Sequence, residues 1–295
     1  SYYLTAEEDK LLQNVSAAFR KTVVVLNIGN LIDFSWVGKY KLDAVLIAWQ
    51  GGMESGNAVA DVLYGNVSPC GKLSDTIARN YEDYPGSAHF GDKLRNEYQE
   101  GIFLGYRYFE KYRKDQILYP LGYGLSYTSF DVTPVGLAYN EAENKITMQV
   151  RITNTGSCAG KEVIKLWCLP PEGRLQKPQR VLVGFGKTQC LEPGGRQNLL
   201  VSAKMDYMAS YDESKHAFLY EKGEYRFMVN ETQYGAIFMK EETIQEQCTE
   251  AAVGGVNLRR RIEKNLPEEL PERVVKTSRL TDVKSGRVPM RQFVA

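Results

Sequence analysis

Two acidic residues and a tryptophan in the N-terminal part of the chain are the side chains best placed to bind a polar ligand. Asp33 and Trp36 follow an unbroken apolar run at residues 23–26, and Glu54 follows a second run at residues 44–49. Carboxylates accept hydrogen bonds from hydroxyl groups, and an indole ring combines a large apolar face with one N–H donor. These three residues are therefore candidates for substrate binding. The alternative for each is a structural role, as a core residue, an ion-pair partner or a helix cap.

The glycine-rich stretch around Glu54 matches neither a nucleophile motif nor a phosphate motif. Ser55 has Met53 and Asn57 two residues away, whereas a nucleophile elbow needs glycine at both places. The Gly-Lys-Ser/Thr ending of a phosphate loop is missing, which disfavours a flavodoxin-like nucleotide binder. The glycines instead predict a sharp turn from a strand into a helix, with Ser55 as the N-cap.

Histidine and cysteine usage predicts neither a metal site nor a cofactor. The two histidines are His89 and His216, and the five cysteines include no Cys-x-x-Cys pair. An odd, scattered cysteine set is more typical of a reducing compartment than of a disulfide framework, so we expect a cytoplasmic protein. No signal peptide is visible and Ser1 is not a natural start, so we expect further residues before it.

The charge balance excludes two classes of partner. The chain has 37 basic and 36 acidic residues, for a net charge of +1, with 43% hydrophobic residues. We therefore expect neither nucleic acid nor an anionic membrane as a partner. No apolar run approaches the roughly 20 residues that a membrane span needs.

Helix and strand patterns alternate through the first part of the chain, which predicts layered α/β structure. The expected elements are a helix over residues 6–20, strands over 23–26 and 44–49, a helix over 57–64 and a strand over 73–78. Thr5 and Glu8 have the spacing of a capping box. The two unbroken apolar runs are typical of strands buried on both faces of a parallel sheet.

Short alternating strands follow after about residue 130. They are expected over residues 145–153, 163–168, 181–185, 197–201 and 225–229. This spacing predicts an antiparallel, immunoglobulin-like β-sandwich. We expect three segments: an α/β part at residues 1–128, the β-sandwich at 129–240, and a linker or arm at 241–295. A helix over residues 258–265 is compatible with the arm.

Several ordered blocks resemble glycoside hydrolase family 3. Trp49-x-Gly-Gly-x-Glu54, continuing to Gly71-Lys-Leu73, resembles its α/β-sandwich domain, as do residues 98–108 and 119–130. Residues 150–163, 182–185 and 191–194 are similar to the fibronectin type III-like domain that follows in many members. Residues 280–295 resemble the lead-in to the catalytic (β/α)8 barrel in members with reversed domain order.

The resemblance implies a β-glucosidase-like enzyme that hydrolyses terminal β-glycosidic bonds with retention. In this family the nucleophile is an Asp on the barrel, and the acid/base is a Glu on a loop just before the position where this chain begins. We therefore expect no catalytic residue in this chain, and no activity of the chain alone. It would form part of the cleft wall and scaffold, with the barrel and a β-glucoside or oligosaccharide as partners. The β-sandwich would brace that wall and provide a homo-oligomer contact.

Two other functions remain open from the sequence: a carbohydrate-binding module, and a purely structural or assembly module. The 19 tyrosines are compatible with a carbohydrate groove but are more typical of domain interfaces. Glu100 and Arg107 lie in a tyrosine-rich block, and we expect them to form a structural ion pair.

Overall fold

The computed structural model describes residues 2–91, 95–97, 100–248 and 277–279. The N-terminal part contains α1 (Ala6–Ala18), β1 (Val23–Leu26), β2 (Ala44–Ile47), α2 (Ser55–Tyr64), β3 (Ile77–Ala78), β4 (Arg95–Glu97), α3 (Tyr106–Tyr112) and β5 (Ile117–Tyr119). Short 3-10 helices lie at η1 (Ser35–Gly38), η2 (Tyr81–Asp83), η3 (Ser87–His89) and η4 (Lys114–Gln116). Within these ranges no helix is long and apolar enough to cross a membrane.

The predicted capping box begins α1. The Thr5 hydroxyl accepts from the Glu8 backbone N–H, and the Glu8 carboxylate accepts from the Thr5 backbone N–H at 2.8 Å. Both bonds satisfy N–H groups that have no partner inside the helix. The helix ends at Ala18, two residues before the predicted end.

β1 and β2 pair in parallel, with Val23 opposite Ala44 and Leu26 opposite Ile47. The prediction that both are buried on both faces is wrong, because Val23 is 47% and Val25 is 39% exposed. The two strands form a sheet with no third strand among the described residues, and α1 has no buried residue. β2 also ends two residues earlier than predicted.

α2 begins at Ser55, two residues before the predicted start at Asn57. Glu54 occupies the N-cap position without a side-chain cap bond, so the predicted Ser55 N-cap is wrong. The helix ends as predicted at Gly65, which has φ 80° and needs no Cβ in that left-handed conformation. The strand predicted over residues 73–78 is shorter, since only β3 forms, antiparallel to β5.

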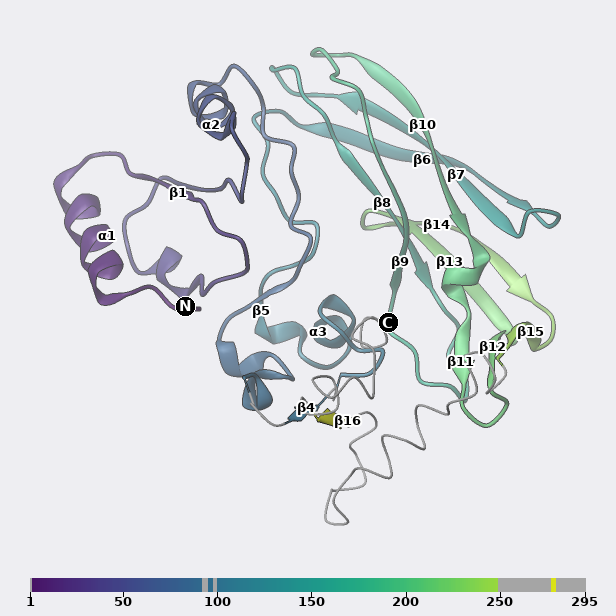
Figure 1. Cartoon of the computed structure of the whole chain (residues 1–295). Helices are drawn as coiled ribbons and strands as arrows, with labels where there is room; N and C mark the ends of the chain where they lie inside the picture. Colours follow the sequence, from purple (N-terminus) through teal and green to yellow (C-terminus); the bar gives the residue numbers. More distant parts are fainter. Residues whose placement is uncertain (1, 92–94, 98–99, 249–276, 280–295) are drawn as a thin grey trace.

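The C-terminal part is a β-sandwich (Figure 1). Its strands are β6 (Phe130–Asn140), β7 (Lys145–Asn154), β8 (Val163–Leu169), β9 (Val181–Lys187), β10 (Arg196–Lys204), β11 (Ser210–Asp212), β12 (Ala217–Tyr220), β13 (Gly223–Val229), β14 (Thr232–Met239) and β15 (Thr243–Gln247), with η5 at Met205–Met208. One sheet has the order β10-β7-β6 and the other β14-β13-β8-β9. The five predicted strands are confirmed within a few residues at each end.

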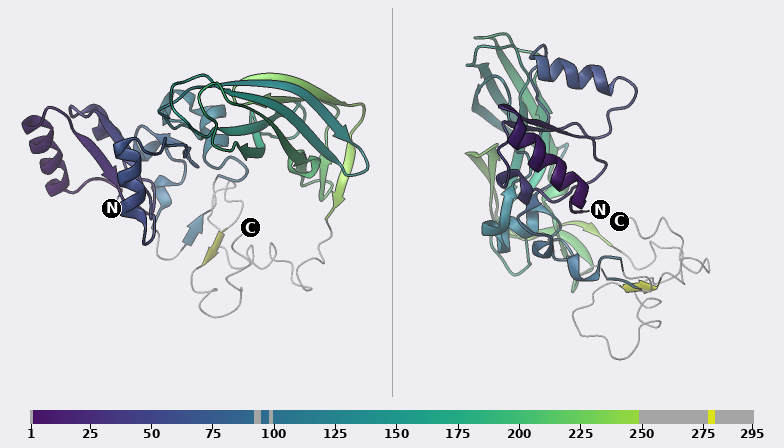
Figure 2. Two further views of the ribbon diagram at one scale, coloured as in Figure 1. Left: turned by 90° about the horizontal axis from the view of Figure 1, so that it is seen from above. Right: turned by 90° about the vertical axis from the view of Figure 1, so that its left-hand side faces the viewer.

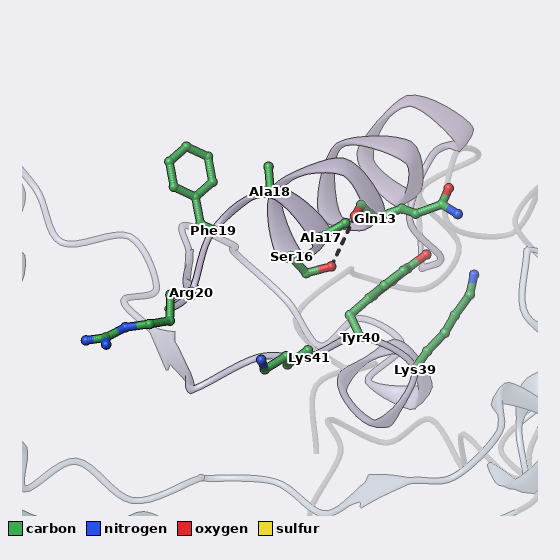
Figure 3. A pocket seen from close by; sticks show the side chains of 9 residues that line it. All are labelled: Gln13, Ser16, Ala17, Ala18, Phe19, Arg20, Lys39, Tyr40 and Lys41. Atoms are coloured by element: carbon green, nitrogen blue, oxygen red, sulfur yellow. Dashed lines mark hydrogen bonds between the residues drawn. The ribbon is translucent and has the colours of Figure 1, made fainter.

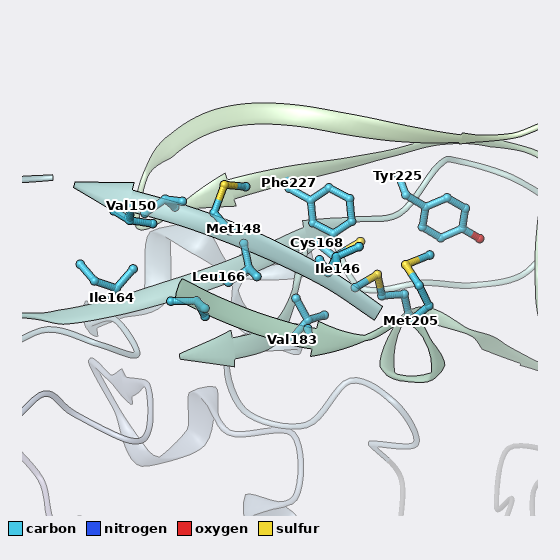
Figure 4. Packing of buried hydrophobic residues seen from close by; sticks show 14 of the residues in the cluster. Ile146, Met148, Val150, Ile164, Leu166, Cys168, Val183, Met205, Tyr225 and Phe227 are labelled. Carbon is cyan, nitrogen blue, oxygen red and sulfur yellow. The ribbon is translucent and has the colours of Figure 1, made fainter. Parts of the chain in front are cut away.

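The core of the sandwich comes from alternating inward positions of the two sheets (Figure 4). On β7, Ile146, Met148, Val150 and Ile152 are fully buried while the residues between them are more exposed. Phe227 and Tyr225 of β13 meet this face from the other sheet. Apolar residues at every second position therefore give each strand one face that is buried in the core of the sandwich.

Two described strands lie in the region predicted as an arm. β15 pairs with β12 in the small sheet β11-β12-β15. β16 (Thr277–Arg279) pairs antiparallel with β4, so the chain returns beside the N-terminal part (Figure 2). The helix predicted over residues 258–265 and the barrel-like lead-in at 280–295 lie outside the described residues.

The β-sandwich is fastened to α3 by a largely buried cluster around Arg180. Two Arg180 nitrogens donate to the Glu110 carboxylate at 2.8 and 2.6 Å, and the guanidinium lies 4.2 Å from the Trp167 ring centroid. The Leu182 backbone N–H donates to the Tyr106 hydroxyl at 2.9 Å. These bidentate and stacking contacts hold α3, and with it the N-terminal part, against β8 and β9.

Candidate functional site

The candidate site is the edge of the small parallel sheet where β1 and β2 end. Parallel strands place their carboxyl ends at one edge, and ligands of α/β sheets bind outside that edge. The loops after the two strands touch there. A Cβ added at Gly29 would lie only 2.9 Å from the Gln50 side-chain nitrogen. A side chain at residue 29 would therefore displace the Gln50 amide from its present position.

Asp33 and Trp36 are brought together in the loop after β1, and both are buried. The Asp33 carboxylate accepts from the Ser35 backbone N–H at 3.1 Å and from the Ser35 hydroxyl at 2.6 Å. The Trp36 indole N–H donates to the Asp33 carbonyl at 2.6 Å, and its ring stacks on Phe34 with centroids 6.0 Å apart. Trp36 is only 3% exposed. This geometry favours the structural role for both residues.

Glu54 lies on the loop after β2, and its side chain is exposed. Its carboxylate accepts from the Asn57 side-chain amide at 2.6 Å and has no hydrogen bond to Asp33 or Trp36. The loop is backbone-strained, because Trp49 has φ 53°, a left-handed conformation that is uncommon for a residue other than glycine. Strain of this kind concentrates at functional sites. Met53, beside Glu54, is fully exposed.

A layer of tyrosines, which the sequence interpretation assigned to domain interfaces, lies beside the loop after β1. The Asp33 backbone N–H donates to the Tyr2 carbonyl at 2.8 Å, and the Tyr2 ring lies 5.0 Å from that of Tyr81 in η2. Tyr3 packs edge-on against Tyr2 at 5.1 Å and is 50% exposed. No motif marks these tyrosines, because residues 2 and 81 are brought together only by the tertiary fold.

Burial and nearby groups raise the pKa values of Tyr2 and Tyr3 in this layer. Burial raises the pKa of Tyr2 well above its usual range, and Tyr84 adds to the effect. Partial burial and the charges of Glu82 and Asp33 raise the pKa of Tyr3. The Tyr2 hydroxyl is buried and has no hydrogen-bond partner among the described residues.

The hollow at the C-terminal end of α1 is not the site. Figure 3 shows its lining, which consists of Gln13, Ser16, Ala17, Ala18, Phe19, Arg20, Lys39, Tyr40 and Lys41. Residues 39–41 precede β2, so the hollow lies at the opposite edge of the sheet from the loops. The Lys39 ammonium is paired at 3.0 Å with Asp9, which lies in the first turn of α1.

The remaining sequence candidates carry no chemistry of their own. The predicted pairing of Glu100 with Arg107 is wrong, because the Arg107 Nε donates to the Tyr106 hydroxyl at 3.4 Å and no Glu100–Arg107 ion pair occurs among the described residues. Burial raises the pKa of Glu100. Across the described ranges no group of three His, Cys, Asp or Glu side chains could hold a metal ion.

Comparison with known proteins connects both halves of the chain to one kind of enzyme. Residues 1–127 match the glycosyl hydrolase family 3 C-terminal domain, and residues 162–233 match a fibronectin type III-like domain. A β-glucosidase of Ruminococcus albus is 42% identical over 232 residues, covering 77% of this chain and 24% of the relative. β-Glucosidase A of Butyrivibrio fibrisolvens is 41% identical over 249 residues, covering 77% of this chain and 30% of the relative.

Solved structures agree with the sequence comparisons. A β-glucosidase from Paenibacillus barengoltzii superposes with a TM-score of 0.80 at 37% identity, covering all of this chain and 37% of the other. β-Glucosidase 3B from Thermotoga neapolitana, solved with α-D-glucose, gives a TM-score of 0.74 at 33% identity, covering 83% of this chain and 35% of the other. The chain therefore spans about a quarter to a third of the length of these curated relatives.

Proposed function

Because this chain belongs to glycosyl hydrolase family 3, we propose that it is the non-barrel part of an enzyme that hydrolyses terminal β-glucosidic bonds with retention. The relatives that match it are named β-glucosidases. In the proposed enzyme the chain supplies one wall of the substrate cleft, and the barrel of the same enzyme supplies the opposite wall.

Retaining hydrolysis requires a nucleophilic carboxylate and an acid/base carboxyl group about 5–5.5 Å apart. We propose that both come from other parts of the enzyme. Of the carboxylates at the sheet edge, Asp33 is buried and already accepts two hydrogen bonds from Ser35. It therefore holds the loop after β1 in place rather than attacking a sugar.

Glu54 has a different role in this proposal. Its carboxylate is exposed, is held by Asn57, and lies on the strained loop after β2. An ionised carboxylate can accept hydrogen bonds from two sugar hydroxyls. We assign to Glu54 the orientation of a substrate hydroxyl and to Trp36 the support of the neighbouring loop.

The observation that carries the proposal is the sheet edge itself, where the loops after β1 and β2 meet over Gly29. The Arg180 cluster supports it, because it fixes α3 against the β-sandwich. The β-sandwich acts as a brace in this arrangement. A homo-oligomer contact through the sandwich is also part of the proposal.

Hydrolysis of p-nitrophenyl β-glucoside tests the proposal. We expect no turnover by the purified 295-residue chain, and turnover by the intact enzyme that carries both this chain and the barrel. Glu54→Gln in the intact enzyme should raise KM, with Asn198→Asp on the exposed face of β10 as a control. Turnover by the isolated chain that disappears on replacing one of its own carboxylates would contradict the proposal.

A reducing, cytoplasmic location is the last part of the proposal. All five cysteines lie within the described residues and are unbonded, and Cys158 and Cys190 are exposed. Exposed thiols persist in a reducing compartment. Fractionation of cells with an antibody to the chain tests the location, and recovery in the culture medium would contradict it.

A further inference from the structure

We propose that the loop between β8 and β9, residues 170–180, is a latch for the C-terminal end of α3, and that Glu221 sets the shape of this latch. Glu221 lies in the turn between β12 and β13, and the hydrogen bonds of its carboxylate to described residues all go to the loop rather than to α3. Its effect on α3 is therefore indirect, through the backbone of the loop, and Glu221 is a positioning residue. The coupling does not depend on which substrate the enzyme hydrolyses.

The Glu221 carboxylate is the centre around which the loop folds. It is buried, and it accepts hydrogen bonds from the Arg174 backbone N–H at 2.9 Å, from the Leu175 backbone N–H at 3.4 Å and from the Lys177 ammonium. A Cβ added at Gly173 would lie 2.5 Å from a carboxylate oxygen, so the backbone passes directly beside this group. A loop has no strand or helix partners for its N–H groups, and here the carboxylate replaces them. Glu221 therefore fixes the backbone over residues 173–175.

Lys177 is the second fixed point of the latch. Its side chain is buried with that of Glu221, and its ammonium also donates to the Pro171 carbonyl at 3.0 Å, across the loop. A buried ammonium is stable only when it is paired and hydrogen-bonded. Without the negative charge of Glu221, the loop would have to open to hydrate Lys177, and the Lys177 backbone would move with it.

Lys111 of α3 connects the latch to the helix. Its ammonium donates to the Lys177 backbone carbonyl, and it lies 5.0 Å from the Phe103 ring centroid and 5.7 Å from that of Tyr112. The two rings pack edge-on, with centroids 5.1 Å apart. A cation over aromatic faces is attracted by their negative charge. Lys111 thus ties the loop both to the last turn of α3 and to Phe103, in the segment before the helix.

The residue before Lys111 binds the same loop. The Glu110 carboxylate accepts from Arg180, at the end of the loop, so two consecutive residues of α3 bind two points of the loop. Both contacts require the loop to place the Lys177 carbonyl and the Arg180 guanidinium correctly. A change at Glu221 should therefore reach α3, although the carboxylate bonds only to the loop.

Amide hydrogen exchange of the full chain, read by mass spectrometry, tests the coupling. Glu221→Gln keeps the size of the side chain but removes its charge, so residues 173–177 should exchange more than about tenfold faster. Residues 100–112 should also exchange about three- to tenfold faster, as expected for loss of a cation–π contact and a charged hydrogen bond. Lys111→Met should give the same acceleration in residues 100–112, and it should change exchange in residues 173–177 by less than about twofold.

Two matched variants serve as controls. Glu224→Gln removes an exposed carboxylate from β13, and Lys114→Met removes an exposed ammonium from η4. Both should leave exchange in residues 100–112 and 173–177 within about twofold of the wild-type rates.

The latch is rejected if Glu221→Gln accelerates exchange in the loop and leaves residues 100–112 unchanged, or if Lys111→Met leaves residues 100–112 unchanged. If Glu221→Gln does not fold, native-state exchange of the wild-type chain at low urea concentrations decides. A common opening free energy for Arg174, Leu175 and α3 supports the latch, and separate opening free energies reject it.

Discussion

The side chain of Asn154 at the end of β7 uses its full hydrogen-bonding capacity inside the protein. Its amide nitrogen donates to the carbonyls of Cys158 at 2.8 Å and Leu191 at 2.7 Å. Its oxygen accepts from the Thr128 hydroxyl at 2.7 Å and from the Gly156 backbone N–H at 3.0 Å. A buried amide with all four bonds made fixes the chain where it enters the β-sandwich.

Asn154→Asp is expected to lower the free energy of unfolding by about 2–3 kcal/mol at pH 7, because a carboxylate cannot donate to the two carbonyls and is left buried beside them. The loss should shrink at low pH, where a protonated Asp regains one donor. Urea denaturation at pH 7 and pH 4 measures both effects. Asn198→Asp on the exposed face of β10 is the control, and equal losses for the two variants would contradict the prediction.

Asp212 gives a second residue-scale prediction. The Arg174 guanidinium at 2.5 Å and the Ser214 hydroxyl at 2.6 Å hold the pKa of this carboxyl well below its usual range. A depressed pKa stabilises the fold above the unfolded-state pKa of about 3.9, and this contribution is lost as the pH falls further. The stability difference between wild type and Asp212→Asn should be constant from pH 7 to pH 5 and should shrink below pH 4. A difference that stays constant to pH 2 would exclude the mechanism.

At the scale of elements, the sequence predicts whether a segment is a strand or a helix better than it predicts how buried that segment is. The alternation over residues 145–153 places β7 correctly, because the β-sandwich buries one face of each strand. The unbroken run at residues 23–26 predicts β1 but not its half-exposed state, since burial depends on neighbours that the pattern does not contain. β3 is shorter than predicted for a similar reason, because its length is set by its pairing with β5.

The candidate site, too, could be predicted from the sequence only in part. Loop positions such as Asp33 and Glu54 could be read from where the apolar runs end. The left-handed backbone of Trp49 and the meeting of Tyr2 with Tyr81 could not, because both depend on tertiary contacts. The Arg180 cluster was also absent from the sequence interpretation, since Glu110 and Arg180 are 70 residues apart.

Arg180→Ala is expected to lower the free energy of unfolding by about 3–5 kcal/mol, because it leaves the largely buried Glu110 carboxylate without its partner. Only 15% of the Arg180 side chain and 10% of the Glu110 side chain are exposed. Amide hydrogen exchange should accelerate in α3 before it does in β7. Arg226→Ala on β13, an exposed arginine, is the control and should change stability by less than about 0.5 kcal/mol. Uniform exchange changes in both elements would argue against a local fastening role.

At the scale of the whole molecule, the chain is two layered parts held together at several places, among them the Lys72–Glu162 ion pair and the bond from Lys165 to the Gly122 carbonyl. The segment around Thr128 joins them covalently, the Arg180 cluster fastens α3 to the sandwich, and β16 pairs with β4. The proposed cleft wall would have to keep its geometry against a partner domain, and several connections restrict relative motion better than one.

Truncation of the chain after Gln247 tests the connection made by β4 and β16. β4 then loses its paired strand, so the backbone N–H groups of Arg95–Glu97 should exchange with solvent faster. The β3–β5 pair should keep its exchange rates, because its contacts do not involve β16. Measurement by hydrogen exchange and mass spectrometry checks the prediction, and unchanged exchange at residues 95–97 would contradict it.

The pairing of β4 with β16 also has a consequence for biosynthesis. The two strands are separated by about 180 residues, and β16 cannot reach its partner until it has left the ribosome. The intervening β-sandwich has its own core and can fold earlier during translation. Closing so long a loop is entropically costly. The pairing of β4 with β16, which completes the N-terminal part, is therefore expected to form late, after the β-sandwich has folded.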